Sequence, residues 1–275
     1  MGYVHTMTVF ETTSAIEKVA DGIFEAEIDE RWWVVRGPHG GYLATIILRA
    51  LLEVQQDTDR PIRSFTTHFL AAPTVGPMRV HADIERVGKS MTYASARAVQ
   101  GDRTVALALA AFSNAWPGLE FDDHPMPEIG RPEDGFQVPI EGDGIPNFLQ
   151  NFDMRWLIGD RPFSGGDEAV LGGWVRLREP VIADAPVVAA LMDAWPPAVF
   201  PKADRLVVAP TIDLTVHFRT ALPIEGAGAE DFYLGRFGSS MARDGFFEED
   251  GELWSSDGRL IAQSRQLALA LTPPP

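Results

Sequence analysis

The sequence predicts an α+β fold made of two tandem units, each an antiparallel sheet wrapped around one central helix. Two observations predict it. The chain repeats itself at an interval of about 150 residues, and each copy contains one apolar helix among a series of strands. A repeat of a whole structural unit indicates two copies of one fold. A chain of 275 residues has room for two domains of ordinary size.

The clearest part of the repeat is an alternating strand. Residues 210–219 read PTIDLTVHFR, in which apolar and polar side chains alternate as they do in a strand with one buried face. Residues 63–73 read RSFTTHFLAAP and match it at an offset of 149, which places Ser64 at the position of Asp213. Two shorter matches follow in the same order, namely GKSM at 88–91 with GSSM at 238–241, and GDRTVALALA at 101–110 with DGRLIAQSRQ at 257–266.

The first copy is predicted to hold its helix at 41–54. This stretch is apolar nearly all round, with only Arg49 and Glu53 clearly polar, so protein should enclose it. Gly40 and Gly41 at its start allow close approach of the backbone and should leave N–H groups facing outward. Strands are expected at 22–28, 31–35, 62–71, 78–87, 91–99 and 104–112.

The second copy repeats this plan. Its helix is predicted at 187–195, because the triplet Asp-Ala-Pro at 184–186 is typical of a helix start and the two prolines at 196–197 end it. Strands are expected at 152–158, 170–177, 210–219, 232–237, 241–254 and 260–271, the fifth with a turn or bulge near Gly245.

An acidic segment separates the copies. Between Trp116 and Pro146 there are eight acidic residues against one Arg, with six Pro and five Gly. Such a composition does not bury a core or hold a helix, so we interpret it as a linker. The predicted division is therefore an N-terminal unit at 1–120, a linker at 121–147 and a C-terminal unit at 148–275.

Composition excludes several classes of protein. The formal charge of −16 argues against a nucleic-acid partner, whose phosphates would be repelled. The absence of cysteine excludes disulfides and thiolate sites, and it fits a reducing compartment. The first residues lack the pattern of a signal peptide, and no apolar run is long enough to span a membrane. We therefore expect a soluble, cytoplasmic protein without a membrane partner.

One buried helix wrapped by an antiparallel sheet, made twice, is the double hotdog pattern. The glycine-led helix, the RSFTTHFL strand, the GKSM hairpin, the Asp-bearing strand and the closing DGRLIAQSRQ strand together resemble the acyl-CoA thioesterases of the type II (TesB-like) family. The resemblance extends over about residues 22–271. It implies hydrolysis of an acyl-CoA thioester by water, using an Asp, a hydroxyl and a Gln of the second copy.

Residue by residue, these three fall on Asp213, Ser240 and Gln266. The family more usually has Thr at the position of Ser240, but the hydroxyl is retained. Gln263 lies three residues from Gln266 and stays open as the alternative amide.

The chemistry of thioester hydrolysis agrees with this trio. A carboxylate in a partly dry site can take a proton from the attacking water, so Asp213 is the predicted general base. Ser240 and Gln266 can hold that water by hydrogen bonds. Backbone N–H groups at the first helix start suit the developing oxyanion. Gly40 and Gly41, with His39 before them, are therefore the predicted substrate-binding residues.

The first copy lacks this chemistry. It has Ser64 in place of the Asp and Ala110 in place of the Gln, and only Ser90 keeps the hydroxyl. We therefore predict one active site per chain.

Other readings stay open. Asp213 could be a solvated strand residue and Gln266 a structural hydrogen-bonding group. A hotdog hydratase or dehydratase would need a paired His and carboxylate, whereas a non-catalytic protein that binds an acyl chain or acyl-CoA would have no need of Asp213. The six histidines show no metal-ligand spacing, so neither metal nor cofactor is expected. Assembly as a homo-oligomer stays open, and so does acyl length, because it depends on how Trp32, Trp33, Trp156, Trp174 and the linker close the acyl channel.

Overall fold

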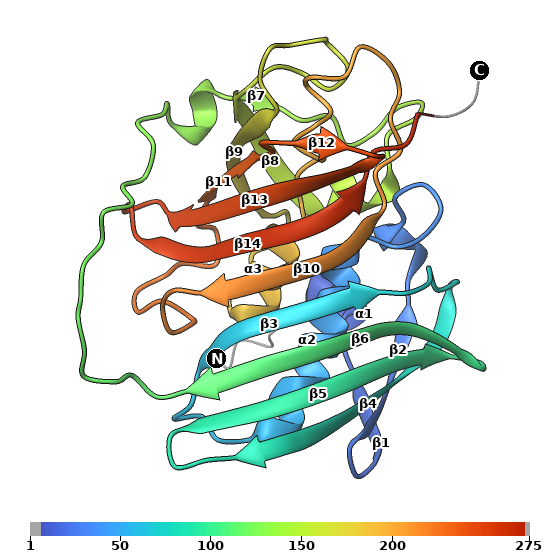
Figure 1. Cartoon of the computed structure of the whole chain (residues 1–275), viewed down its shortest axis with the longest axis vertical. Coiled ribbons are helices and arrows are strands. Elements are labelled where there is room, and N and C mark those ends of the chain that lie inside the picture. The colour runs from blue at the N-terminus through green and yellow to red at the C-terminus, as the bar shows by residue number, and fades with distance from the viewer. Residues whose placement is uncertain (1–6, 273–275) are drawn as a thin grey trace, which may run out of the picture.

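One antiparallel sheet runs through the molecule (Figure 1). The computed structural model describes residues 7–272, and within them the sheet has 14 strands. Its strands follow one another in the order β1 (Glu17–Ala20), β2 (Ile23–Ile28), β4 (Gly76–Val87), β5 (Met91–Gln100), β6 (Arg103–Ser113), β3 (Ile62–Phe69), β10 (Thr211–Phe218), β14 (Leu260–Leu269), β13 (Phe246–Ser255), β11 (Tyr233–Gly238), β9 (Val170–Leu177), β8 (Phe152–Ile158) and β7 (Phe136–Gln137). The short β12 (Ala242–Arg243) pairs with β13 beside this row.

The two copies meet at the middle of the sheet. Strand β3 of the first pairs antiparallel with β10 of the second, with His68 opposite Asp213 and Thr67 opposite Leu214. We call β1 to β6 the first unit and β8 to β14 the second unit. Pairing edge to edge removes the free edge that each unit would otherwise expose.

Two helices cover one face of the sheet and lie behind it in Figure 1. They are α2 (Gly40–Gln55) in the first unit and α3 (Ala185–Leu191) in the second. They contact each other, and the Thr45 hydroxyl donates to the carbonyl of Pro186 at 2.9 Å. We call the helix-covered side the inner face and the other side the outer face. The remaining helical segments are α1 (Val9–Thr13) and the 3-10 turns η1 (Glu30–Trp32), η2 (Pro132–Asp134) and η3 (Asn147–Asn151).

The core lies between the helices and the inner face. Ile46 and Ile47 of α2 pack with Phe65 of β3 and Phe112 of β6, and all four are fully buried. The apolar residues of 41–54 are thus enclosed as the sequence predicted, because protein surrounds the helix on nearly all sides. The double hotdog prediction is confirmed. Within residues 7–272, none of the helices has the length and hydropathy needed to cross a membrane.

Two local predictions are wrong. Residues 31–35 are not a strand: Trp32 ends a 3-10 turn, stacks on Tyr42 at 4.9 Å and donates from Nε1 to the Thr13 hydroxyl at 2.8 Å. This indole is a core group that fixes the chain before α2. Helix α3 covers Ala185–Leu191 instead of the predicted 187–195, and Met192 is its C-cap.

The acidic segment lies on the outer face of the second unit. Trp174 donates from Nε1 to the carbonyl of Gly130 at 2.8 Å, and the ring of His124 stacks on Trp254 at 5.7 Å. Met126 and Ile129 pack against the same aromatic cluster. We call residues 121–135 the strap. Trp174 therefore contacts the strap on the outer face.

Candidate active site

The predicted catalytic trio is divided between the two faces of the sheet. Residues directly opposite each other in an antiparallel pair point to the same face. Asp213 lies opposite Leu267, which is 38% exposed, whereas Gln266 lies opposite Leu214, which is fully buried. Asp213 is therefore on the outer face and Gln266 on the inner face.

A bulge explains why Thr211, two positions before Asp213, faces inward. The register of β10 against β14 shifts between Thr211 and Asp213, so the extra residue reverses the alternation at this point. Thr211 consequently pairs with Ala268 and bonds to Gln266 from the inner side.

Ser240 and Gln263 are also away from Gln266. Ser240 lies in the exposed turn before β12, and its backbone N–H donates to Oε1 of Glu248 at 2.8 Å. Gln263 lies opposite His217 on the outer face, four positions along the strand from the level of Asp213, or about 13 Å at the usual rise. The structure therefore does not bring Asp213, Ser240 and Gln266 together, and Gln263 is also distant from Asp213.

The side chain of Gln266 is held at both ends by inner-face residues. Its Nε2 donates to Oε1 of Glu249 at 2.5 Å, and its Oε1 accepts from the Thr211 hydroxyl at 3.0 Å. The other carboxylate oxygen of Glu249 accepts from the backbone N–H of Ala198 at 2.5 Å. Glu249 is only 3% exposed and Gln266 only 7%. The amide therefore has one defined orientation in a nearly dry setting.

Glu249 is a buried carboxyl group with a perturbed pKa. Burial raises the pKa of Glu249 to about 8, and the nearby charges of Asp193 and Asp250 act in the same direction. The hydrogen bonds from Ala198 and Gln266 favour the ionised form and oppose this rise. The group can therefore change its protonation state near neutral pH.

The start of α2 lies on the other side of Asp193. The carboxylate of Asp193 accepts from the backbone N–H of Gly41 at 2.7 Å, and Nδ1 of His39 accepts from that of Tyr42 at 3.1 Å. Because Nδ1 accepts, Nε2 of His39 carries the hydrogen and donates to the carbonyl of Asp193 at 2.6 Å. Burial raises the pKa of Asp193, against the opposing effects of His39 and Gly41.

These contacts correct the expectation of outward-facing N–H groups, since those of Gly41 and Tyr42 are used inside the protein. His39, predicted to bind substrate, is 3% exposed and stacks on Phe148 at 4.7 Å. The glycines are nevertheless required here. A Cβ on Gly40 would lie 2.8 Å from the Asp193 carboxylate, and one on Gly41 would lie 3.0 Å from the carbonyl of Ala190.

Sequence reasoning missed Glu249, Asp193 and Thr211. Glu249 had a detectable signal, because it alternates with Phe247 and Leu253 on the inward side of β13, where a charge is out of place. Asp193 had a weaker one, as the single charge in the apolar stretch that ends α3. Thr211 had none, because the bulge cannot be seen in the alternation.

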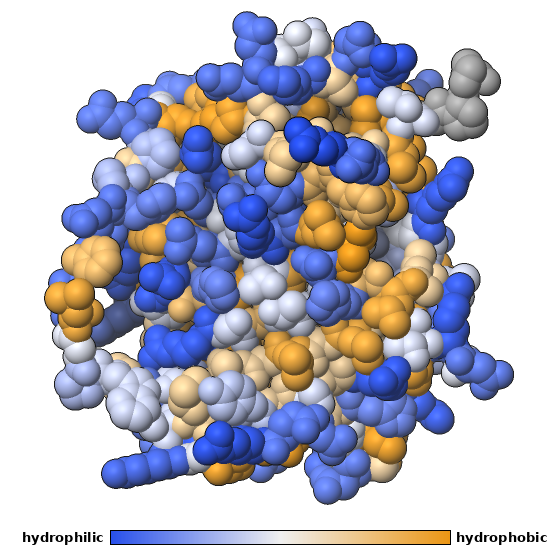
Figure 2. Space-filling view, in the orientation of Figure 1, coloured by the Kyte–Doolittle hydropathy of each residue, from blue (hydrophilic) through white to orange (hydrophobic). Residues whose placement is uncertain are grey.

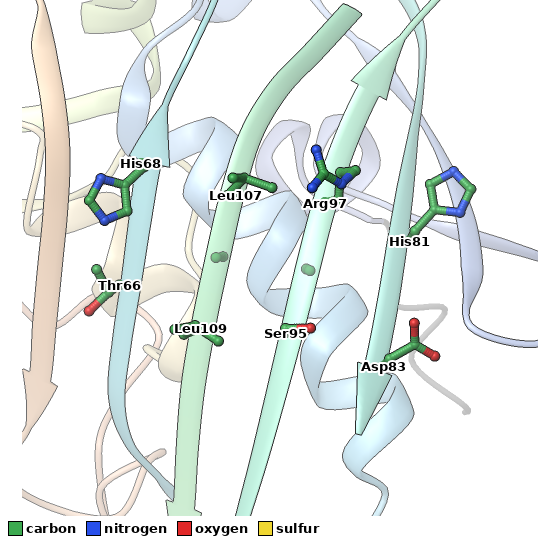
Figure 3. A pocket seen from close by; sticks show the side chains of 10 residues that line it. Thr66, His68, His81, Asp83, Ser95, Arg97, Leu107 and Leu109 are labelled. Atoms are coloured by element: carbon green, nitrogen blue, oxygen red, sulfur yellow. The ribbon is translucent and has the colours of Figure 1, made fainter. Parts of the chain in front are cut away.

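A second feature lies on the outer face of the first unit. An open groove of about 490 Å³ crosses β3, β6, β5 and β4, and its lining includes His68, Arg97 and Asp83 (Figure 3). His68 Nδ1 lies 4.0 Å from the Asp213 carboxylate, so Asp213 belongs beside this groove. Hydrophilic and apolar side chains are mixed over this face (Figure 2). The groove contains neither Gln266 nor a helix start, and we therefore place the candidate active site on the inner face.

Comparison with known proteins places this chain in a family. Models of the acyl-CoA thioesterase N-terminal and C-terminal domains match residues 28–113 and 122–270. The chain belongs to the acyl-CoA thioesterase family, as the sequence resemblance indicated, and it is therefore a thioester hydrolase by family.

Individual relatives cover nearly the whole chain. An uncharacterised protein of Mycobacterium tuberculosis is 28% identical over an alignment of 273 positions, which covers 90% of each chain. A hotdog-fold protein of unknown function from Alicyclobacillus acidocaldarius superposes with a TM-score of 0.89 at 25% identity, over 98% of this chain and 100% of that one. A putative thioesterase II from Thermobifida fusca gives a TM-score of 0.81 at 27% identity, over 97% and 98%.

Proposed function

We propose that the chain hydrolyses an acyl-CoA to the free acid and CoA, and that the reaction takes place on the inner face around Gln266. Membership of the acyl-CoA thioesterase family supports the substrate class. The single observation that supports the site is the amide of Gln266, buried and held between Glu249 and Thr211. A glutamine is one of the three groups that the family resemblance implies.

The held amide is suited to orient a water molecule. After its two hydrogen bonds, the Gln266 amide keeps one N–H and one carbonyl lone pair. The N–H can donate to a water oxygen, and the carbonyl oxygen can accept a hydrogen bond from a water. A fixed attacking water removes much of the entropic barrier to the reaction. The start of α2 carries the positive end of the helix dipole, which favours the negative charge that develops on the thioester oxygen.

A carboxylate must take the proton from this water. Asp213 was predicted for that role from the family resemblance, and its catalytic role stays a prediction. Its position on the outer face, opposite Leu267, separates it from the water that Gln266 would hold.

A panel of acyl-CoAs of increasing chain length, with release of the free thiol as the readout, tests the proposal. On the substrate turned over fastest, Gln266→Ala should lower kcat by about 10²-fold, because misplacing a reacting group by 1 Å can cost that much. Gln263→Ala is the matched control on the same strand and should leave kcat unchanged. Equal rates for wild type and Gln266→Ala would contradict the proposed site.

A non-catalytic acyl-CoA-binding protein is the second candidate. One observation favours it: the carboxylate of Asp193 already accepts the N–H of Gly41, where an oxyanion was expected. In that case the panel would give no thiol release, while calorimetry would still detect binding of an acyl-CoA.

A further inference from the structure

A threonine on the inner face of β3 keeps an unpaired hydroxyl in the core. Thr67 is fully buried, and its Oγ1 has no hydrogen-bond partner among residues 7–272. Buried polar groups in proteins are nearly always hydrogen-bonded, because burial removes their water and an unpaired group receives nothing in exchange. The hydroxyl of Thr67 therefore calls for an explanation.

The second unit shows that packing does not require this hydroxyl. At the repeat offset of 149, Thr67 matches Val216 of β10. The pairing of the two units agrees, since Thr67 lies opposite Leu214 while Val216 lies opposite Phe65, the residue that matches Leu214. Val216 is also fully buried and has nearly the shape of a threonine. A valine at position 67 would thus fill the same space without burying an unpaired polar group.

Thr67 lies in line with the amide of Gln266. Thr67 of β3 is directly opposite Leu214 of β10, and Leu214 is directly opposite Gln266 of β14. Opposed residues point to the same face, and neighbouring strands are about 4.8 Å apart. The backbone of Thr67 is therefore about 10 Å from that of Gln266, with one leucine side chain between them.

The other neighbours of Thr67 on this face are apolar. Phe69 lies two residues along β3, and its ring is 3.4 Å from the place where a Cβ on Gly40 would lie, at the start of α2. On the next strand, the buried Ala108 is directly opposite Thr67. An acyl chain that leaves a thioester at Gln266 along this row would contact Leu214 first and then reach the hydroxyl of Thr67.

We infer that Thr67 determines specificity, and that its hydroxyl forms a hydrogen bond with an oxygen substituent, hydroxyl or oxo, on the acyl chain of the substrate. The inference rests on the proposed thioesterase function and deepens it by naming the class of acyl group. A threonine hydroxyl can donate one hydrogen bond and accept others, so it can pair with either substituent. A substrate without the oxygen leaves the hydroxyl unpaired and is therefore disfavoured.

Acyl-CoAs of one chain length test the inference, one unsubstituted and the others with a hydroxyl or an oxo group at carbon 3 or further along the chain. In wild type, kcat/KM from thiol release should be higher for at least one substituted acyl-CoA than for the unsubstituted one. Thr67→Val should lower this ratio by roughly 3- to 10-fold, as expected for the loss of one hydrogen bond. A wild type without any preference, or a ratio unchanged in Thr67→Val, would overturn the inference.

Two further variants separate recognition from structure. Thr67→Ser keeps the hydroxyl and should retain the preference. Val216→Thr places a hydroxyl at the matching position of the second unit, outside the row of Gln266, and should leave the ratio at its wild-type value. The urea midpoint of Thr67→Val should not fall, because the lost hydroxyl has no partner in the protein. A lower midpoint with an unchanged ratio would assign the hydroxyl a structural role and overturn the inference.

Failure of the proposed function looks different from failure of the inference. In that case wild type would release no thiol from any member of the panel, substituted or not, and the inference would be lost together with the function on which it rests. Thiol release without a preference that depends on Thr67 would overturn the inference alone.

Discussion

The two units share one architecture but divide the work at one place in the sheet. The first unit has Ala94 and Ala110 there, and their side chains need no hydrogen-bond partners. The second fills it with Glu249 and Gln266, which are satisfied only because Thr211 and Ala198 supply further hydrogen bonds. The comparison teaches that the fold tolerates either solution, but the polar one needs a complete set of partners.

The same division extends to the helix starts. In the first unit, α2 begins at glycines beside the carboxylate of Asp193. In the second, α3 is capped by Asp184, whose side chain accepts from the backbone N–H of Val187 at 2.9 Å, and Pro186 follows in its first turn. Of the two helices, α2 is the one that starts next to Asp193, whose charge acts on Glu249. One unit therefore contributes the helix start and the other the polar side chains, which explains a single candidate site per chain.

The largest expected effect comes from placing the glutamate and the glutamine at the matching positions of the first unit. Ala94→Glu places a carboxylate where it has no prepared donors, so the free energy of unfolding should fall by roughly 3–5 kcal/mol, the cost of an uncompensated buried charge. Adding Ala110→Gln supplies one donor and should recover about 1–2 kcal/mol, as hydrogen bonds to charged groups do. Urea unfolding of both single variants and the double variant gives this coupling. If the two losses simply add, the opposed positions do not interact as Glu249 and Gln266 do.

The next largest expected effect is on the pH dependence of stability, because Glu249 can ionise whereas the alanines of the first unit cannot. The pKa of Glu249 is raised to about 8 in the folded protein, from an ordinary value of 4.5. A carboxyl group with a raised folded-state pKa stabilises the fold fully below its unfolded pKa, and this contribution is lost as the pH rises towards the folded pKa. The urea midpoint should therefore fall between pH 5 and pH 9.

The Glu249→Gln variant is the control for this prediction. An amide cannot titrate, so its urea midpoint should fall less over the same range. Part of the decline should persist, because burial also raises the pKa of Asp193. Identical declines in wild type and variant would show that Glu249 is not the group responsible.

Much of the fold could be predicted from the sequence, because alternation and the internal repeat report directly on buried faces. The strand of Asp213 and the enclosed helix α2 follow from such patterns. The failure at 31–35 has a physical cause: Trp32 is apolar and adjacent to other apolar residues whether it lies in a strand or packs on Tyr42 from a 3-10 turn. Local pattern does not distinguish these two cases.

The candidate site was harder to predict, because it depends on contacts across strands. The alternation already placed Asp213 on the polar face of its strand, whereas Gln266 shares the buried face of β14 with Ser264 and Ala268. The resemblance to a family assigned residue types to positions but did not report which face each one occupies. The partnership of Glu249 with Gln266 depends on the register of β13 against β14, and no single segment contains that register.

The outer faces offer the smallest test of the comparison between units. The strap covers the second unit there, and His124 joins it to the sheet through an ion pair with Glu252 at 2.5 Å and the stack on Trp254. Because the side chain of His124 is 45% exposed, solvent screens this ion pair, and His124→Gln should cost no more than about 1 kcal/mol of unfolding free energy. Thiol release should be unchanged, since the strap lies on the face opposite Gln266. A loss of turnover without a loss of stability would instead connect the outer face to the reaction, and Asp213 beside the first unit's groove would then regain its claim to a catalytic role.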